Sequence, residues 1–228
     1  MNTTGNDAEV RAMDWDVRPF GWILVVASVL ATMFALMHPQ ITGNDLAGVM
    51  RQMVAGATFA AWVHGILIAL YLATVAGFFG LTRYLGFDRP AAVIGLVCYA
   101  AGIFAMTGAA VINGFALEIF SGRYPTVRPG DVMALASSFN IASSIAVVWA
   151  GLGAVATSGA ILAWSVCLLA QGGPARVIGV FGILLALATV AMLVTGTLIL
   201  NVHGFLLLVV SQAAWTIAVA VRMIGGRV

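Results

Sequence analysis

Long apolar runs separated by short polar segments dominate the hydrophobic pattern of this chain. A helix needs about 20 apolar residues to cross the hydrocarbon core of a bilayer. Six runs come close to that length or exceed it, so the pattern predicts six membrane-spanning helices. Their approximate bounds are 20–37, 58–81, 91–120, 145–169, 177–196 and 202–221.

The segment 131–171 allows two interpretations, because it is too long for a single span. Its first part is rich in serine and asparagine, whereas residues 145–169 are almost entirely apolar. One interpretation is a surface helix followed by one span, which gives six spans in all. The other is a pair of short spans, which gives seven.

The positions of the arginines favour six spans, because cytoplasmic loops of membrane proteins carry the excess of positive charge. With six spans and the N-terminus inside, seven arginines fall inside and three outside; seven spans would leave four inside and six outside. We therefore predict a multi-pass protein of the cell membrane with both termini cytoplasmic. The inner set is Arg11, Arg18, Arg83, Arg89, Arg176, Arg222 and Arg227, and the outer set is Arg51, Arg123 and Arg128.

Two outer segments, in loops 1 and 3, have apolar residues at helical spacing. After Asn44 or Asp45, either of which suits a helix N-cap, apolar residues recur from Leu46 to Val54. The segment that follows Asp131 repeats this arrangement. We expect a short amphipathic interfacial helix in each loop.

The predicted fold is therefore an all-α polytopic membrane bundle of six transmembrane helices. Residues 1–19 would form a polar cytoplasmic tail, 20–222 the six-span membrane domain, and 223–228 a second cytoplasmic tail.

Composition agrees with a bilayer environment. Hydrophobic residues make up 62% of the chain and charged residues 8%, with a mean hydropathy of +1.08, whereas soluble domains carry about 25% charged residues. Positive charge is too sparse for nucleic-acid binding. The chain has no lysine, which excludes a Schiff base to retinal or pyridoxal phosphate.

Small residues recur at every fourth position in several predicted spans, as in Ala101, Ala105 and Ala109. Such stripes allow helix backbones to approach closely in lipid. Packing within the bundle is one interpretation, and contact with a second copy or with partner subunits is the other.

The polar residues of the spans concentrate on one side of the membrane. A string at Val63-His64-Gly65 recurs at Val202-His203-Gly204, and both copies open spans that run inward. With the predicted topology, the strongly polar side chains of the spans fall in the outer third, where we expect an outward-facing polar pocket. They are His38, His64, Asn113, Glu118, Asn201 and His203.

One hypothesis for this pocket is a redox or metal site. His64 and His203 lie at similar predicted depth and could be the two axial ligands of a b-type haem. Alternatively, imidazole and carboxylate groups could together hold a divalent metal ion. That set would be His38, His64, His203 and Glu118.

A second hypothesis comes from a resemblance to rhomboid proteases, which share the six-span layout. That family has Gly-x-Ser-Gly in span four and a histidine in span six. This chain has Ala156-Thr157-Ser158-Gly159 and His203 at those places, with His64 where the family has an oxyanion histidine. The resemblance implies an intramembrane serine hydrolase with Ser158 as nucleophile. The chain departs from the pattern at Ala156, and at Ile68 where the family has asparagine.

A third hypothesis is a role without catalysis, either as a small-solute transporter or as an accessory subunit of a membrane complex. A transporter typically has broken helices and polar groups near the bilayer midplane, where the pattern offers little beyond Ser158, Tyr71 and Thr107. The histidines could also simply form hydrogen bonds at helix ends, and Glu118 could pair with Arg123. The sequence leaves these alternatives open.

Overall fold

A computed structural model describes residues 16–38, 41, 43, 45–124 and 127–226. These residues form helices and connecting turns, with no strand among them. The elements are α2 (Arg18–Leu36), α3 (Leu46–Leu85), α4 (Pro90–Val111), the π-helix η2 (Ile112–Ala116), α5 (Leu117–Arg123), the 3₁₀ turn η3 (Pro129–Asp131), α6 (Val132–Leu169), α7 (Gly173–Val194) and α8 (Val202–Gly225). Because α4, η2 and α5 follow one another without a break, they form one rod.

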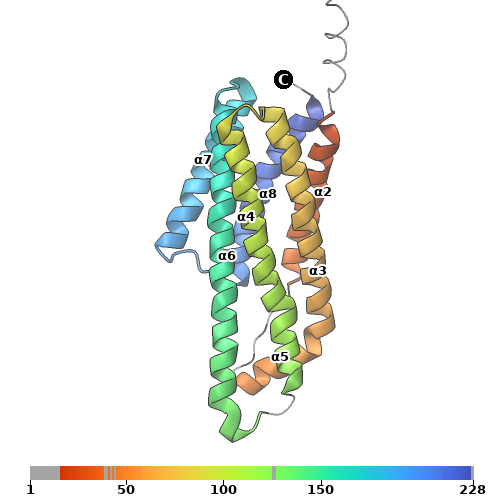
Figure 1. Cartoon of the computed structure of the whole chain (residues 1–228), viewed down its shortest axis with the longest axis vertical. Helices are drawn as coiled ribbons and strands as arrows, with labels where there is room; N and C mark the ends of the chain where they lie inside the picture. The colour runs from red at the N-terminus through yellow and green to blue at the C-terminus, as the bar shows by residue number, and fades with distance from the viewer. Residues whose placement is uncertain (1–15, 39–40, 42, 44, 125–126, 227–228) are drawn as a thin grey trace, which may run out of the picture.

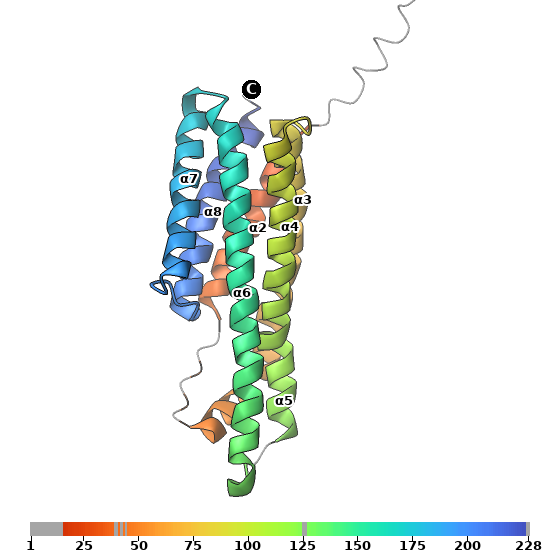
Figure 2. The same cartoon turned by 60° about the vertical axis from the view of Figure 1, so that its left-hand side comes forward.

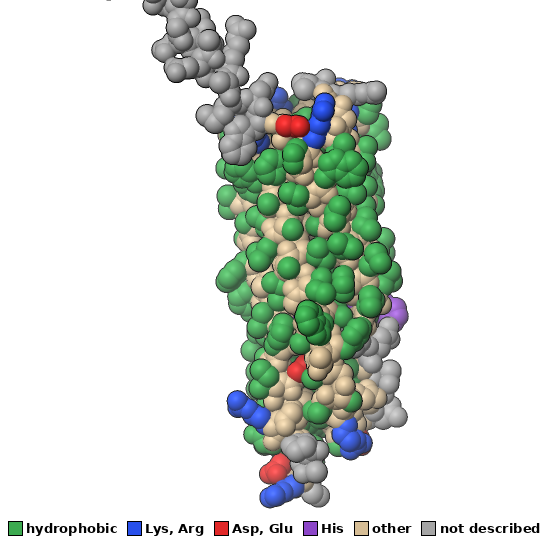
Figure 3. All heavy atoms as spheres, turned by 90° about the vertical axis from the view of Figure 1, so that its right-hand side faces the viewer, with side chains coloured by type: hydrophobic (Ala, Val, Ile, Leu, Met, Phe, Trp, Pro, Cys, Tyr) green, Lys and Arg blue, Asp and Glu red, His purple; other side chains and the backbone are tan. Residues whose placement is uncertain are grey.

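Six of these helical rods are long and apolar enough to cross a membrane, which confirms the predicted all-α six-span fold. Residues 132–169 form a single helix, so the seven-span alternative is wrong. In Figure 3, hydrophobic side chains cover the middle of the face shown, and most charged side chains lie near its two ends.

The helices lie side by side, and α2 begins at the same end of the bundle at which α8 ends (Figure 1). We call this the terminal end, and the opposite one the distal end. Figures 1 and 2 show that α3, α5 and α6 extend at the distal end well beyond α2, α7 and α8. At 1.5 Å per residue, the three long rods measure roughly 50–60 Å and the three short helices roughly 28–36 Å.

Local sequence explains where several of the helices begin and end. Pro19 and Pro90 lie in the first turns of α2 and α4, where the missing backbone N–H costs nothing. Asn201 caps α8 by accepting a hydrogen bond from the backbone N–H of Gly204 at 3.0 Å. At the other end of α8, Gly226 adopts a left-handed φ of 58°, which glycine accommodates without steric cost.

The prediction of separate amphipathic helices in loops 1 and 3 is wrong. The first segment is the beginning of α3, and the second is the beginning of α6. No proline interrupts either segment, so the helix can continue through it. The hydroxyls of Ser137 and Ser138 donate to carbonyls one turn earlier, so the helix itself supplies their hydrogen-bond partners. The expected cap is present, since the Asp45 carboxylate accepts a hydrogen bond from the Gly48 N–H at 2.6 Å. Figures 1 and 2 show that the first turns of α3 lie across the bundle before the helix bends.

The core of the terminal half is an aromatic stack. Trp164 of α6 is fully buried and stacks on Phe78 of α3, with ring centroids 4.6 Å apart, and on Trp215 of α8 at 6.3 Å. The Trp164 indole Nε1–H donates to the Thr82 hydroxyl at 3.2 Å and to the Ala92 carbonyl at 3.0 Å. Trp164 thus joins α6 to α3, α4 and α8.

Glycines bring the helices around this stack close together. A Cβ on Gly95 would lie 2.6 Å from Nε1 of Trp164. A Cβ on Gly102 of α4 would lie 3.0 Å from the carbonyl oxygen of Gly153 of α6. A Cβ on Gly153 would likewise lie 3.0 Å from the carbonyl oxygen of Gly102. By contrast, Ala101 of the predicted stripe is exposed, although Ala105 and Ala109 are buried. The tight contact in this region is therefore between glycines.

We expect Trp164→Phe to reduce the free energy of unfolding by roughly 1–2 kcal/mol. The substitution keeps an aromatic ring in the stack but removes the N–H that bonds Thr82 and Ala92. Unfolding of the purified protein in detergent measures this change. Trp22→Phe is the control, since Trp22 is 57% exposed and should tolerate the change. Equal stability of the two variants would contradict the assigned role of Trp164.

Candidate ligand-binding cavity

A cavity of about 530 Å³ lies in the distal half of the bundle. Most of its wall is apolar, with residues such as Leu67, Met106, Ala110, Val147 and Phe205. The rest of the wall carries polar side chains from five different segments. They are His38, His64, Asn113, Glu118, Ser143 and Asn201.

The lengths of the helices explain why a space remains here. The described part of the chain leaves α2 at His38 and enters α8 at Asn201, and both residues line the cavity. Beyond that level α3, α5 and α6 continue without α2 or α8 between them (Figures 1 and 2). The cavity is therefore enclosed by three long rods and by the connecting segments at the ends of two short helices.

His64 and His38 are in direct contact in the cavity wall. Their Nε2 atoms are 3.2 Å apart, and their rings meet edge to face with centroids 4.9 Å apart. Nδ1 of the buried His64 lies 2.8 Å from the carbonyl oxygen of Ala60. Because a carbonyl only accepts, Nδ1 of His64 carries a proton, and in the neutral ring Nε2 is then an acceptor. His38 consequently donates its Nε2–H to His64.

The His64 ring packs against the π-helix η2 at Gly114. A Cβ on Gly114 would overlap Cβ, Cγ and Nδ1 of His64, so only glycine allows the ring to pack against this rod. The backbone N–H of Leu117 bonds to the carbonyl of Ile112, five residues earlier. Single π turns of this kind are frequent at functional sites. The extra residue in the turn places both Asn113 and Glu118 in the cavity wall.

Glu118 is the one acidic side chain that lines the cavity among the described residues. It is only 9% exposed, and its Oε2 has no hydrogen-bond partner among them. The pairing with Arg123 suggested by the sequence is absent, since the described residues contain no ion pair between the two. A buried acidic oxygen without a partner is costly, which makes Glu118 a place where a bound molecule would gain a contact.

His203 lies apart from this group. It is exposed in the first turn of α8, two residues after the Asn201 cap, and it does not line the cavity. The proposed haem ligands His64 and His203 thus do not face one another across this space. Among the described residues, no three His, Cys, Asp or Glu side chains come together as a metal site. The set His38, His64, His203 and Glu118 is therefore not assembled as a group.

The serine–histidine pair of a hydrolase is also not formed. Ser158 is 1% exposed, and its hydroxyl has no hydrogen-bond partner among the described residues. Neither Ser158 nor His203 lines the cavity that contains His64.

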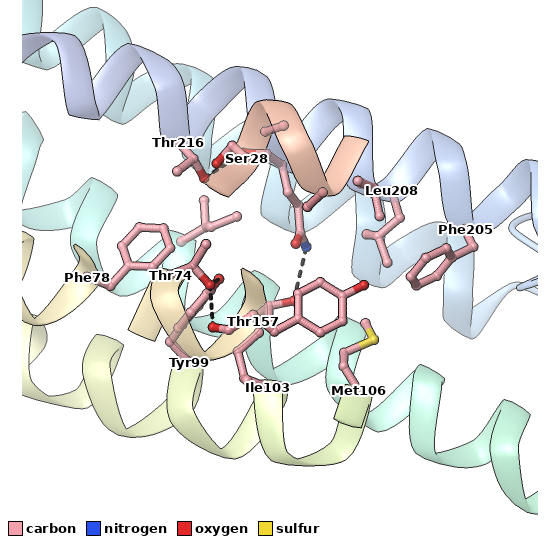
Figure 4. A pocket seen from close by; sticks show the side chains of 16 residues that line it. Ser28, Thr74, Phe78, Tyr99, Ile103, Met106, Thr157, Phe205, Leu208 and Thr216 are labelled. Carbon is pink, nitrogen blue, oxygen red and sulfur yellow. Dashed lines mark hydrogen bonds between the residues drawn. The ribbon is translucent and has the colours of Figure 1, made fainter. Parts of the chain in front are cut away.

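A smaller chamber of about 70 Å³ adjoins the cavity toward the middle of the bundle, and Tyr71, Met106 and Phe205 line both. Figure 4 shows the polar side chains that point into it from several helices. The Tyr99 hydroxyl donates to Thr74 at 2.8 Å, and the Gln212 amide donates to Thr157 at 3.1 Å.

Our sequence interpretation missed this polar group, although one signal was present. Gln212 is the one amide side chain in the apolar run 204–221, and it lies near the middle of that run. Thr74, Thr157 and Thr216 could not be distinguished by sequence from the many threonines whose hydroxyls bond to their own helix. All three do so, since their hydroxyls donate to the carbonyls of Tyr71, Ala154 and Gln212 respectively.

Comparison of the chain with protein-family models, with curated proteins and with solved structures returned no match.

We expect Gly114→Ala to destabilise the protein by roughly 1–3 kcal/mol, because the added methyl group overlaps the His64 ring. The matched control is Gly122→Ala in α5, where a Cβ meets nothing within 4 Å. That control should be neutral or stabilising by up to about 1 kcal/mol, since alanine favours the helix. Thermal unfolding in detergent compares the two. A Gly114→Ala variant as stable as the control would contradict the packing of His64 against η2.

Proposed function

We propose that this protein is a multi-pass membrane protein that binds a small amphiphilic molecule in the distal cavity. The observation that carries the proposal is the composition of the cavity wall, which is apolar over most of its area and polar at a few side chains. Binding sites for small molecules have this composition, with a few polar groups that orient the ligand. The volume of about 530 Å³ lies within the usual range of such sites, about 300–1,000 Å³.

The two kinds of wall suggest how the ligand lies. The polar side chains of His38, Asn113, Glu118 and Asn201 would contact a headgroup. Toward the middle of the bundle, the wall at Leu67, Met106 and Phe205 suits a hydrocarbon tail. The aromatic stack around Trp164 fills the bundle beyond the small chamber, which favours a binding site that is closed at one end over a continuous channel.

Binding of haem in the same cavity would require two changes in the structure. Iron coordination by Nε2 of His64 would require this atom to give up its hydrogen bond with His38, and His203 would have to enter the cavity wall. An amphiphile requires neither change, so we favour it. An absorption spectrum of the purified protein distinguishes the two, because a bound haem gives an intense Soret band.

We expect Ala110→Phe to reduce occupancy of the cavity by tenfold or more, because Ala110 lines it and the phenyl ring fills part of it. 1-Dodecanol is a suitable neutral probe, and native mass spectrometry counts the molecules retained by the protein after release from detergent. The matched control is Ala101→Phe, on the exposed face of the same helix, which should bind like the unmodified protein. Equal retention by both variants would contradict the proposed site.

We further propose that the distal end faces the outside of the cell, as the distribution of arginines suggests. In a variant without Cys98 and Cys167, single cysteines at Arg128 and at Arg176 mark the distal and terminal ends. A membrane-impermeant maleimide applied to intact cells should label Arg128→Cys only, and lysis should expose Arg176→Cys as well. If only Arg176→Cys is labelled in intact cells, the protein has the opposite orientation and the proposal is contradicted.

A further inference from the structure

Glu118 has a carboxyl group buried in the wall of the distal cavity. It is only 9% exposed, it lines the cavity wall, and its Oε2 has no hydrogen-bond partner among the described residues. Carboxyl groups at such places in a membrane protein are costly, and they usually face a cavity or pair with a cation or donor. The Glu118 carboxyl group therefore needs a cation or a hydrogen-bond donor as its partner.

The described part of the protein supplies no cation for Glu118. The one ion pair in that part joins Arg18 to Asp16 at the terminal end. Arg51, Arg123 and Arg128 are the arginines at the distal end; all three are exposed, and none forms an ion pair with Glu118 among the described residues. His38 and His64 use the facing nitrogens of their rings for each other.

The surroundings of Glu118 suit a protonated amine. Asn113, which the π turn places in the same wall, offers an amide oxygen as a second acceptor. An ammonium group carries donors and no acceptor, so the carboxylate and this oxygen are both suitable partners for it. Most of the rest of the cavity wall is apolar and suits an alkyl chain.

We propose that the ligand of the distal cavity is a lipophilic amine, whose ammonium group binds the carboxylate of Glu118 while its apolar part lies along Leu67, Met106 and Phe205. This inference rests on the proposed binding function and adds the chemical class of the ligand. Glu118 would determine specificity, because a neutral amphiphile of the same length can fill the apolar part but cannot pair with the charge.

Two probes of equal chain length test the charge, namely dodecylamine and 1-dodecanol. Native mass spectrometry in one detergent gives the affinity of each for the full-length protein. We expect the unmodified protein to bind the amine at least tenfold more tightly than the alcohol. This comparison needs no variant and is independent of any effect of substitution on folding.

Glu118→Gln keeps the size of the side chain and removes its charge. It should weaken dodecylamine binding by tenfold or more and change dodecanol binding by less than twofold. Asp131→Asn is the matched control, because Asp131 is an exposed acid at the distal end outside the cavity wall, and it should leave both affinities unchanged.

The possible failures are distinguishable. If the unmodified protein binds both probes equally, or if Glu118→Gln weakens both alike, the cavity binds amphiphiles but the assignment of an amine to Glu118 is overturned. If Asp131→Asn weakens the amine as much as Glu118→Gln does, the preference reflects general surface charge, and the assignment is also overturned. If the unmodified protein binds neither probe, the binding function itself fails, and the amine assignment fails with it.

Discussion

The difference in length between the helices is the constraint on which the rest of this structure depends. Three rods, α3, α4–α5 and α6, are almost twice as long as the hydrocarbon core is thick, whereas α2, α7 and α8 roughly match it. All six can pack together only over the terminal half. In the distal half the long rods continue without α2 and α8, and the space between them is the cavity. The connecting segments at His38 and Asn201 bring backbone and polar side chains to its edge.

The two halves of the bundle consequently have different kinds of packing. Around Trp164, stacked aromatic rings and glycine contacts leave little space, and the indole N–H is bonded to two partners. In the distal half, the π turn at η2 and the glycine at 114 admit the His64 ring, while the Glu118 oxygen remains without a partner. Irregular helix turns such as η2 are expected where structure serves binding more than stability. The cavity is thus a local departure from an otherwise well-packed bundle.

The number of spans was predictable from apolar run length and from arginine positions. Run length must match the thickness of the hydrocarbon core, and arginines are enriched on the cytoplasmic side. The extent of each helix was not, since a polar or amphipathic segment such as 46–54 can extend a span when no breaker follows it. The same limit explains the two histidines. His64 and His203 occupy nearly identical strings, but His64 lies 18 residues into α3, whereas His203 follows the cap of α8 by two residues. Sequence also could not show the contact between His38 and His64, the π turn, or the empty space that no side chain fills.

The central claim is that the distal cavity, and not the lipid-facing surface, holds an amphiphile. The most direct measurement is photo-crosslinking with an alkylamine that carries a diazirine near the end of its chain, followed by peptide mapping. The account predicts crosslinks concentrated on cavity-wall residues such as Leu67, Met106 and Ala110, and their loss when unlabelled dodecylamine is added in excess. Crosslinks distributed over exposed residues such as Trp22, Phe104 and Leu184, unaffected by the competitor, would contradict it.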